Sequence, residues 1–365
     1  MVGKVTTARL AFPSWRMLSI AVFPPISRIK EQMRFGWLYS FRALPEQSRR
    51  SPRPHSPGDP APKGEIYMRQ AIKSTLFCLT LSSLLFAADY RFVKIDFPDA
   101  AITRATGINA RGELVGFYDD VNGFTHGFLL RKGVFSSIDF PNASLTFARA
   151  INARGDIAGW FQFEDGNDHG FVLRDGQFTQ IDFPNAITTT PRGTNNASDI
   201  TGNYPNPNCG DCESGFILRD GVFYDVHIPG GFTSDIWMAQ DNGQVMVGDA
   251  AMKPDFALHG FIRDKRGEFH LIDFPGLSVP CTAPRWINER GDVVGLFAHV
   301  STIDDCYAGP PAHGFLLRQG KYVAIDVPGS TNTRPLAIND DGQIVGFYTD
   351  GAGVNHGFRA VPKDE

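Results

Sequence analysis

Hydrophobic and polar positions recur in one repeated phrase from Tyr90 to the end of the chain. The phrase consists of IDFP, a polar passage rich in Ala and Thr, an Asn-x-x-Gly turn, a hydrophobic run such as ELVGFY, a loop, and HGFLLR before a turn glycine. Its proline recurs at spacings of 43, 43, 45, 46 and 53 residues, at Pro98, Pro141, Pro184, Pro229, Pro275 and Pro328. A period of this length is typical of four-stranded propeller blades.

Each repeat predicts four short strands. In the first repeat these are Ala105–Asn109, Glu113–Tyr118, Gly127–Arg131 and Val134–Asp139. The first two are joined by a tight turn in which Gly112 can adopt positive φ, and the last two by a Lys-Gly turn. The alternation of hydrophobic runs with turn residues therefore predicts two hairpins per repeat.

The two ends of the repeat region complement each other. The region begins with a lone fourth strand, Arg91–Asp96, and stops after a lone third strand, Gly357–Val361. Pairing these strands would close a ring and remove two exposed sheet edges. We therefore predict an all-β fold, a six-bladed β-propeller of four-stranded blades closed by its N- and C-terminal strands. The alternative is an open row of units with both ends uncapped.

Composition agrees with a repetitive all-β protein. The 365 residues include 38 Gly, 25 Pro and 30 Phe, and the formal net charge is −4. These values exclude a collagen, a coiled coil, a disulfide miniprotein and a strongly basic nucleic-acid binder.

The N-terminal part predicts export. Residues 68–88 have a basic start, an apolar stretch too short to span a membrane and small residues at their end, as a secretory signal peptide does. Residues 1–67 carry 11 basic and 4 acidic residues and cannot bury a core, so we interpret them as a disordered leader that translation from Met68 would omit. A translated cytoplasmic leader is the alternative. The predicted mature domain, 89–365, has 22 basic and 35 acidic residues.

The repeats resemble the HAF-repeat family of extracellular proteins, which carry a His-Ala-Phe motif and an Asn-x-x-Gly-x-Val-Val-Gly stretch. Here the second motif reads INARGELVG, INERGDVVG and INDDGQIVG. The triplet reads His-Gly-Phe and begins at His126, His169, His259, His313 and His356. The resemblance covers the predicted mature chain, apart from Gly for Ala and the IDFP phrase. It implies secretion and a repeat architecture, and no established activity.

Five arginines precede the Asn-x-x-Gly turns and are the candidate ligand-binding residues: Arg104, Arg149, Arg192, Arg285 and Arg334. They stand two or four residues before the Ile, or Thr194 in one repeat, that ends the first strand. Residues two apart face the same side of a regular strand. Guanidinium groups around a central channel would bind carboxylate, sulfate or phosphate. The alternative is structural: each arginine stacks on a Phe and pairs with an IDFP aspartate, which would be Asp139, Asp182, Asp273 or Asp326.

Histidines and acidic loops offer two metal hypotheses. One histidine per blade is too widely spaced for a shared metal, so we expect these imidazoles to form hydrogen bonds between strands, and we predict no metal site from them. The long loops carry many oxygen ligands, which suit calcium. They are Asp119, Asp120, Asn122, Glu164, Asp165, Asn167, Asp168, Asp211, Glu213, Asp304, Asp305 and Asp350. Solvated loops are the default interpretation, and we expect no cofactor.

Four cysteines remain after signal cleavage, an even number that predicts disulfides in an exported protein. The turns after the first and third strands are tight and lie on one face of the ring, so the opposite face, here called the long-loop face, carries the loops after IDFP and after the ELVGFY-like strand. Cys281 and Cys306 belong to one blade and both lie at this face, so we pair them. Cys209 and Cys212 then close a small loop. One zinc site of four thiolates and a redox Cys-x-x-Cys are the alternatives.

The chain contains no G-x-S-x-G elbow, P-loop, H-E-x-x-H or dinucleotide fingerprint, so no catalytic residue can be assigned. We predict a secreted monomer, extracellular or periplasmic, that binds an acidic saccharide or another anion at the face carrying the long loops. A glycoside hydrolase or lyase would need carboxylates beside the arginines. A structural surface protein with a protein partner is the third hypothesis. The net charge argues against nucleic acid, and nothing indicates membrane contact after cleavage.

Overall fold

The structure is a computed structural model that describes residues 90–207 and 212–363. The predicted leader (1–67) and signal peptide (68–88) lie outside the described residues and stay predictions. Within the described ranges, no helix is both long and apolar enough to cross a membrane.

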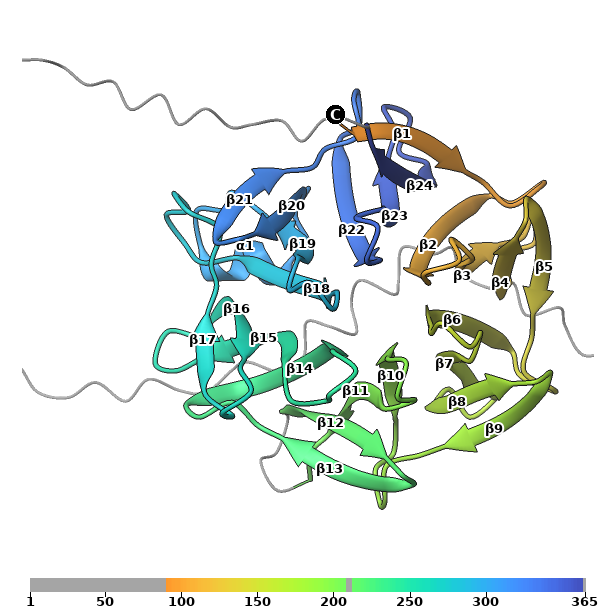
Figure 1. Cartoon of the computed structure of the whole chain (residues 1–365), viewed down its shortest axis with the longest axis horizontal. Helices are drawn as coiled ribbons and strands as arrows, with labels where there is room; N and C mark the ends of the chain where they lie inside the picture. The colour runs from red at the N-terminus through yellow and green to blue at the C-terminus, as the bar shows by residue number, and fades with distance from the viewer. Residues whose placement is uncertain (1–89, 208–211, 364–365) are drawn as a thin grey trace, which may run out of the picture. The chain divides into compact units, whose positions relative to one another are not determined.

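Six antiparallel four-stranded sheets form a ring of blades (Figure 1). Blade one contains β2 (Ile102–Ile108), β3 (Leu114–Asp119), β4 (Thr125–Arg131) and β5 (Val134–Ile138). Blade two contains β6 (Leu145–Ile151), β7 (Ile157–Gln162), β8 (Asp168–Arg174) and β9 (Gln177–Ile181). Blade three contains β10 (Thr190–Thr194), β11 (Ile200–Pro205), β12 (Glu213–Arg219) and β13 (Val222–Val226). Blade four contains β14 (Gly231–Ala239), β15 (Met246–Met252), β16 (Ala257–Arg263) and β17 (Phe269–Leu271). Blade five contains β18 (Thr282–Ile287), β19 (Val293–Phe297), helix α1 (Ile303–Tyr307), β20 (His313–Arg318) and β21 (Lys321–Ala324). Blade six contains β22 (Asn332–Ile338), β23 (Ile344–Thr349), β24 (Asn355–Pro362) and β1 (Tyr90–Ile95).

Strand β1 completes blade six and closes the ring. It pairs antiparallel with β24 over its whole length, from Tyr90 opposite Pro362 to Ile95 opposite Gly357. The Tyr90 hydroxyl also donates to the carbonyl oxygen of Gly342 at 3.2 Å. The predicted six-bladed propeller and its closure are therefore confirmed, and the open row of units is wrong.

The HGF and VG motifs together fill the core of each blade. The Phe of HGF, or of Ser-Gly-Phe in blade three, is almost fully buried in every blade: Phe128, Phe171, Phe216, Phe261, Phe315 and Phe358. Each ring lies over a glycine on the neighbouring second strand, and a Cβ on Gly116, for example, would meet the Phe128 ring at 2.7 Å. The second strand therefore requires glycine at this position, because any side chain would overlap the buried ring.

The Phe of IDFP joins successive blades by ring stacking. Phe97 follows the outer strand of blade six and stacks on Tyr118 of blade one with ring centroids 3.7 Å apart. Phe140 stacks in the same way on Phe161 of blade two at 3.6 Å. The repeated phrase thus spans two blades, which explains why it includes the connection between them.

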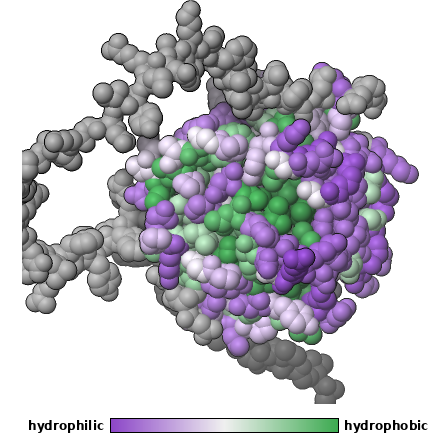
Figure 2. All heavy atoms as spheres, turned by 60° about the vertical axis from the view of Figure 1, so that its left-hand side comes forward, coloured by the Kyte–Doolittle hydropathy of each residue, from purple (hydrophilic) through white to green (hydrophobic). Residues whose placement is uncertain are grey.

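The surface has hydrophilic residues over most of the view in Figure 2, with hydrophobic residues gathered near its middle.

The Asp of IDFP binds the His of HGF in the same blade. The Nδ1 atom of His126 lies 2.7 Å from a carboxylate oxygen of Asp139. The equivalent pairs are His169–Asp182, His259–Asp273, His313–Asp326 and His356–Asp96. The histidines therefore bridge third and fourth strands, as the structural interpretation predicted. The idea that these aspartates pair with the five arginines is wrong, because the aspartates follow the outer strands whereas the arginines lie on the inner ones.

Candidate functional site

Every inner strand contains a β-bulge at the same place. Strands β2, β6, β10, β14, β18 and β22 surround the central axis (Figure 1), and each skips one residue at this place in its pairing with the next strand. The residues skipped at this place, here called the bulge ring, are Thr106, Arg149, Arg192, Trp237, Arg285 and Leu336. Strand β14 skips a second residue, Phe232, near its start. A bulge leaves its extra residue unpaired and redirects the side chain. The repeat thus places one such position from each blade around the axis.

Three arginines of the bulge ring converge on Trp237, which is the member of the ring from blade four. The guanidinium carbon of Arg285 lies 3.9 Å from the centroid of the Trp237 ring, that of Arg192 at 4.8 Å and that of Arg149 at 5.6 Å. Three cations from three different blades therefore converge on one indole. Cation–π contacts of this kind contribute about 0.5–2 kcal/mol each, depending on desolvation.

A second ring lies two residues earlier on the same strands, nearer the long-loop face. It consists of Arg104, Phe147, Thr190, Asp235, Ala283 and Arg334, each paired with the second strand of its blade. The Arg104 guanidinium lies over the Phe347 ring at 4.6 Å and near the Phe117 ring at 5.5 Å. The five predicted arginines, here called the arginine cluster, thus occupy two depths rather than one continuous strand face.

The positive charges of the arginine cluster act on one another. Burial lowers the pKa of Arg149 well below its usual range, and the charges of Arg192, Arg285 and Arg104 lower it further. Burial likewise lowers the pKa of Arg334, with added repulsion from Arg285 and Arg104. All five side chains retain partial solvent exposure. The cluster is therefore a concentrated positive region in a domain whose predicted net charge is negative.

Few protein groups neutralise this cluster. Among the described residues, the single ion pair that involves any of the five is Arg285 to Asp249, with Nη1 and Oδ1 2.6 Å apart. Arg192 donates from Nε to the amide oxygen of Asn203 at 2.9 Å. The Nε atoms of Arg104 and Arg149 are buried and have no hydrogen-bond partner in the described part of the chain.

Blade four adds two carboxyl groups to the site. Asp235 on β14 and Asp249 on β15 are direct partners in the strand pairing. The Trp237 Nε1 atom donates to Asp249 Oδ1 at 2.6 Å, as does Arg285. Burial and the negative charge of Asp249 raise the pKa of Asp235 to about 8. The site therefore combines several cations with an adjacent pair of acids.

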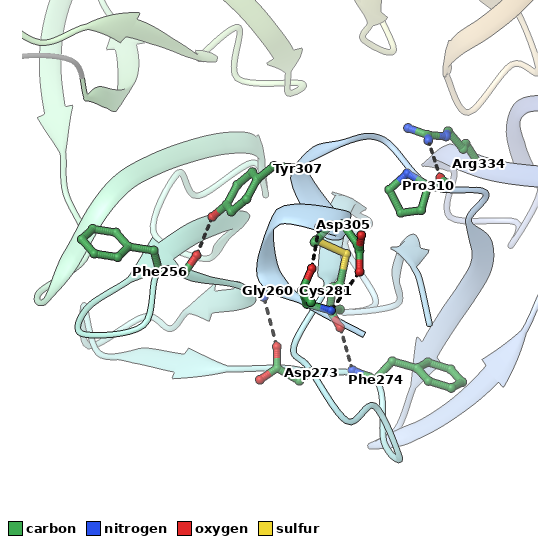
Figure 3. The surroundings of a disulfide bond; sticks show 12 residues. Phe256, Gly260, Asp273, Phe274, Cys281, Asp305, Tyr307, Pro310 and Arg334 are labelled. Atoms are coloured by element: carbon green, nitrogen blue, oxygen red, sulfur yellow. Dashed lines mark hydrogen bonds between the residues drawn. A yellow bond between two sulfur atoms is a disulfide. The ribbon is translucent and has the colours of Figure 1, made fainter. Parts of the chain in front are cut away.

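A disulfide holds one long loop at this face. Cys281 and Cys306 are bonded, as predicted. The loop between β19 and β20 includes α1, and Figure 3 shows two of its contacts beside the disulfide. The Pro310 carbonyl oxygen accepts from Arg334 at 3.2 Å, and the Tyr307 hydroxyl donates to the Phe256 carbonyl oxygen at 2.7 Å. Partial burial and the charges of Asp249 and Asp255 raise the pKa of Tyr307 to about 12, so its hydroxyl is a neutral donor at ordinary pH.

The second predicted disulfide and the calcium hypothesis for the acidic loops both stay predictions. Cys209 lies outside the described residues, so its pairing with Cys212 stays a prediction. Asp120 in a long loop accepts backbone N–H groups of its own loop, from Asn122 at 2.8 Å and from Phe124 at 2.9 Å. The calcium hypothesis for such loops stays untested. One further group of possible ligands, Asp264, Glu268 and His270, lies on the β16–β17 hairpin.

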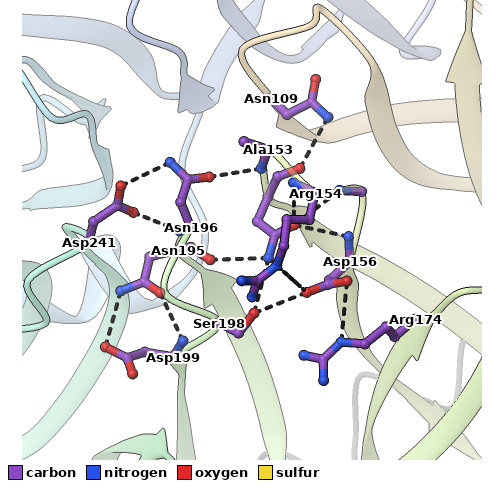
Figure 4. Close-up of polar contacts among 12 residues, drawn as sticks. Asn109, Ala153, Arg154, Asp156, Arg174, Asn195, Asn196, Ser198, Asp199 and Asp241 are labelled. Carbon is purple, nitrogen blue, oxygen red and sulfur yellow. Dashed lines mark hydrogen bonds and ion pairs between the residues drawn. The ribbon is translucent and has the colours of Figure 1, made fainter.

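The opposite face, where the Asn-x-x-Gly turns lie, carries a closed ring of hydrogen bonds between blades. Each turn side chain donates to the backbone carbonyl oxygen of the equivalent residue in the next blade, over 2.7–3.2 Å. The donors in order are Asn109, Asn152, Asn195, Gln240, Asn288 and Asn339. Figure 4 shows part of this ring. The amides of this face hold the blades together and line a small cavity on the axis. The long-loop face is taken as the candidate site because the guanidinium groups without ion pairs lie towards it.

Sequence reasoning found the arginines but missed Trp237, Asp235 and Asp249. The phrase is irregular in blade four, where Gln240 replaces the turn Asn. Counting three and five residues back from Gln240, as from the Asn of the other blades, gives Trp237 and Asp235. That alignment was the available signal. Asp249 follows only from the strand pairing.

Known proteins resemble this chain in fold. No protein-family model and no curated protein sequence matches it. Among solved structures, AofleA from Arthrobotrys oligospora has a TM-score of 0.48 at 11% identity, over 77% of this chain and 96% of that one. A mutant of the Aleuria aurantia lectin in complex with alpha-methyl-L-fucoside has 0.43 at 11%, over 74% and 97%. A streptogramin B lyase structure has 0.40 at 14%, over 74% and 97%. The similarity concerns the propeller fold alone.

Proposed function

We propose that this protein is an exported binding module that holds an anionic ligand, an acidic saccharide in particular, on the axis at its long-loop face. The observation that carries the proposal is the arginine cluster, in which four of five guanidinium groups have no ion pair among the described residues. An unpaired charge in a densely packed site is costly, whereas a bound anion would compensate it.

The chemistry around the cluster favours a sugar acid over a simple ion. Guanidinium groups bind carboxylates through two parallel hydrogen bonds. Aromatic rings line the same region, where Phe147 stacks on Trp160 at 3.9 Å and contacts Phe117 at 4.6 Å. Aromatic faces suit the apolar faces of sugar rings, and the arginines suit their carboxylates. The cluster therefore matches both parts of a uronic acid.

The experiment measures binding of tri-galacturonate to the full chain by isothermal titration calorimetry, with the neutral trisaccharide as comparison. We expect binding of the acid alone, weakened by added salt. The variant Arg149→Met should bind at least about tenfold more weakly, because it removes one charge-assisted contact of about 1.5–3 kcal/mol. The exposed Arg266→Ala is the matched control and should bind as the unmodified protein does.

Stability of the same variants separates binding from structure. Arg149→Met removes a charge that has no ion pair and is repelled by neighbouring arginines, which offsets the loss of its contact with Trp237, so the free protein should be about as stable as before. Equal affinity for acidic and neutral sugars would contradict the proposal. So would an Arg149→Met variant that was less stable but bound the acidic sugar with unchanged affinity, since the arginine would then be structural. Absence of binding to any small anion would favour a protein partner instead.

A second candidate function is hydrolysis or elimination on the same acidic saccharide. The paired carboxyl groups of Asp235 and Asp249 beside Arg285 favour it, because acid–base catalysis needs a protonated and an ionised group together. Release of new reducing ends or unsaturated products from oligogalacturonate would support it. An Asp235→Ala variant that retained this turnover would remove Asp235 from the reaction.

A further inference from the structure

Asp235 is the exception among charged residues of the second ring. It occupies in blade four the register position that Arg104 and Arg334 occupy in blades one and six. A strand position shared by all blades faces the same way in each, so the Asp235 carboxyl belongs to the axis as those guanidinium groups do. An acid at this place would repel the anion that the arginine cluster attracts, unless the acid is neutral.

The geometry of Asp249 identifies it as the ionised partner. Its Oδ1 atom accepts two short hydrogen bonds, one from the indole N–H of Trp237 and one from the guanidinium of Arg285, each at 2.6 Å. One of these donors carries a full positive charge. Burial raises the pKa of Asp249 above its ordinary value, but its contacts with Arg285 and Trp237 act in the opposite direction. Asp249 is therefore the acid of the pair that holds the negative charge more readily.

Asp235 has the opposite surroundings. Its Oδ1 atom is buried and has no hydrogen-bond partner within the described residues. Two neighbouring carboxyl groups in a buried site do not both ionise easily, so the proton belongs on the group without donors. Burial and the charge of Asp249 accordingly raise the pKa of Asp235 to about 8.

Charged groups on β10, β12, β15 and β18, which pack against β14, enter this balance. Asp249 on β15 and Glu213 on β12 favour the neutral form of Asp235, whereas Arg192 on β10 and Arg285 on β18 favour the ionised form. Arg219, also on β12, is occupied by Asp199, with Nη2 and Oδ2 2.7 Å apart. The two acids outweigh the two arginines because burial acts in the same direction as the acids.

We propose that Asp235 acts as a neutral carboxylic acid that donates a hydrogen bond to an oxygen of the bound anion, so that its ionisation in alkaline solution releases the ligand. This inference rests on the proposed function and names the residue that regulates it. A cationic group on the ligand is disfavoured at this place, because Arg192 and Arg285 face Asp235. The ligand oxygen is therefore a carboxylate, hydroxyl or ring oxygen of the acidic sugar.

The test is a pH series of tri-galacturonate titrations on the full chain, from about pH 6.5 to about pH 9.5, a range in which the probe itself keeps its charge. Affinity should be constant on the acid side and fall about tenfold per pH unit above the Asp235 transition. Asp235→Asn keeps a neutral donor, so it should bind at both ends of the range with similar affinity. Asp249→Asn removes the neighbouring charge, so it should move the transition to lower pH.

The controls distinguish a wrong role for Asp235 from a wrong assignment of the anion site. The hairpin-loop variant Asp264→Asn should show the pH profile of the unmodified protein. If tri-galacturonate binds at all pH values with one affinity, or if Asp235→Asn keeps the alkaline loss, the role of Asp235 is wrong while the anion site stands. If nothing binds even at the acid end, the proposed function is wrong. Infrared difference spectra between unmodified protein and Asp235→Asn give an independent readout, since absence of a protonated carboxyl band near neutral pH would also overturn the assignment.

Discussion

The ring of side-chain amides on the tight-turn face makes a quantitative prediction for Asn288→Ala. Asn288 is 4% exposed, and its Nδ2 atom donates to the carbonyl oxygen of Asn339 in the next blade at 3.1 Å. Its Oδ1 atom accepts from the backbone N–H groups of Arg290 at 3.1 Å and Asp292 at 2.9 Å. Alanine removes these contacts, together with the bond from Nδ2 to Asp292 Oδ2 at 3.3 Å, and cannot replace any of them.

The magnitude follows from the groups that lose their partner. The buried Asp292 N–H loses its hydrogen-bond partner, whereas the Asn339 carbonyl keeps the N–H of Gly342 at 3.0 Å and water can reach the N–H of the exposed Arg290. A buried polar group left without a partner costs about 1–3 kcal/mol and the lost bond to Asn339 adds about 1 kcal/mol, so the free energy of unfolding should fall by about 2–4 kcal/mol. For a domain of this size the melting temperature should fall by about 5–15 °C.

The assay is equilibrium unfolding in urea together with thermal unfolding, both followed by circular dichroism on the full chain. Asn196→Ala is the matched control, because Asn196 lies on the same face and contacts the neighbouring blade through Asp241 but is exposed. It should cost less than about 1 kcal/mol. If Asn288→Ala were no more destabilising than Asn196→Ala, the amide ring would not hold the blades together and the reasoning would be refuted.

Two further predictions concern the stability of single blades. Replacing both Cys281 and Cys306 by serine opens a loop of sequence separation 25. The free energy of unfolding should fall by about 3 kcal/mol, measured by denaturant titration without reductant. An unchanged midpoint would contradict this prediction. Burial raises the pKa of Glu113, but hydrogen bonds from Arg111 and the charge of Arg131 outweigh it and leave the pKa below its ordinary value. The stability that Glu113 adds is thus complete above about pH 4.3 and is lost as pH falls through the lower folded value, so Glu113→Gln should flatten this part of the acid unfolding curve.

The strands and their closure could be predicted because their determinants are local. Gly112 has φ of 71° in the turn of the first hairpin, as its place after Asn-Ala-Arg suggested. The predicted strand Val134–Asp139 differs from β5 by one residue at its end. Ring closure followed from counting, since the chain starts with a fourth strand and ends with a third.

The site was harder to predict because its geometry depends on β-bulges and on pairing between strands, which the local alternation of hydrophobic and polar residues does not reveal. The inner strands were treated as regular, so Arg104 and Arg149 were placed on one side by counting in twos. A bulge skips Thr106 in blade one and Arg149 itself in blade two, so counting in twos across it does not give the side that each arginine faces. Pairing of the arginines with IDFP aspartates failed for a related reason: two strands separate the inner from the outer edge of every blade.

The distribution of charge around the axis explains why blade four departs from the repeat. Blades two, three and five contribute arginine from the bulge ring, and blades one and six contribute arginine from the second ring. Five blades therefore supply one guanidinium each, and blade four supplies Trp237 and Asp235 instead. Six identical blades would surround an anion with equivalent cations and could not orient it. One blade with an indole and a neutral acid breaks that equivalence, so the irregular repeat is the one that can set the direction in which a ligand binds.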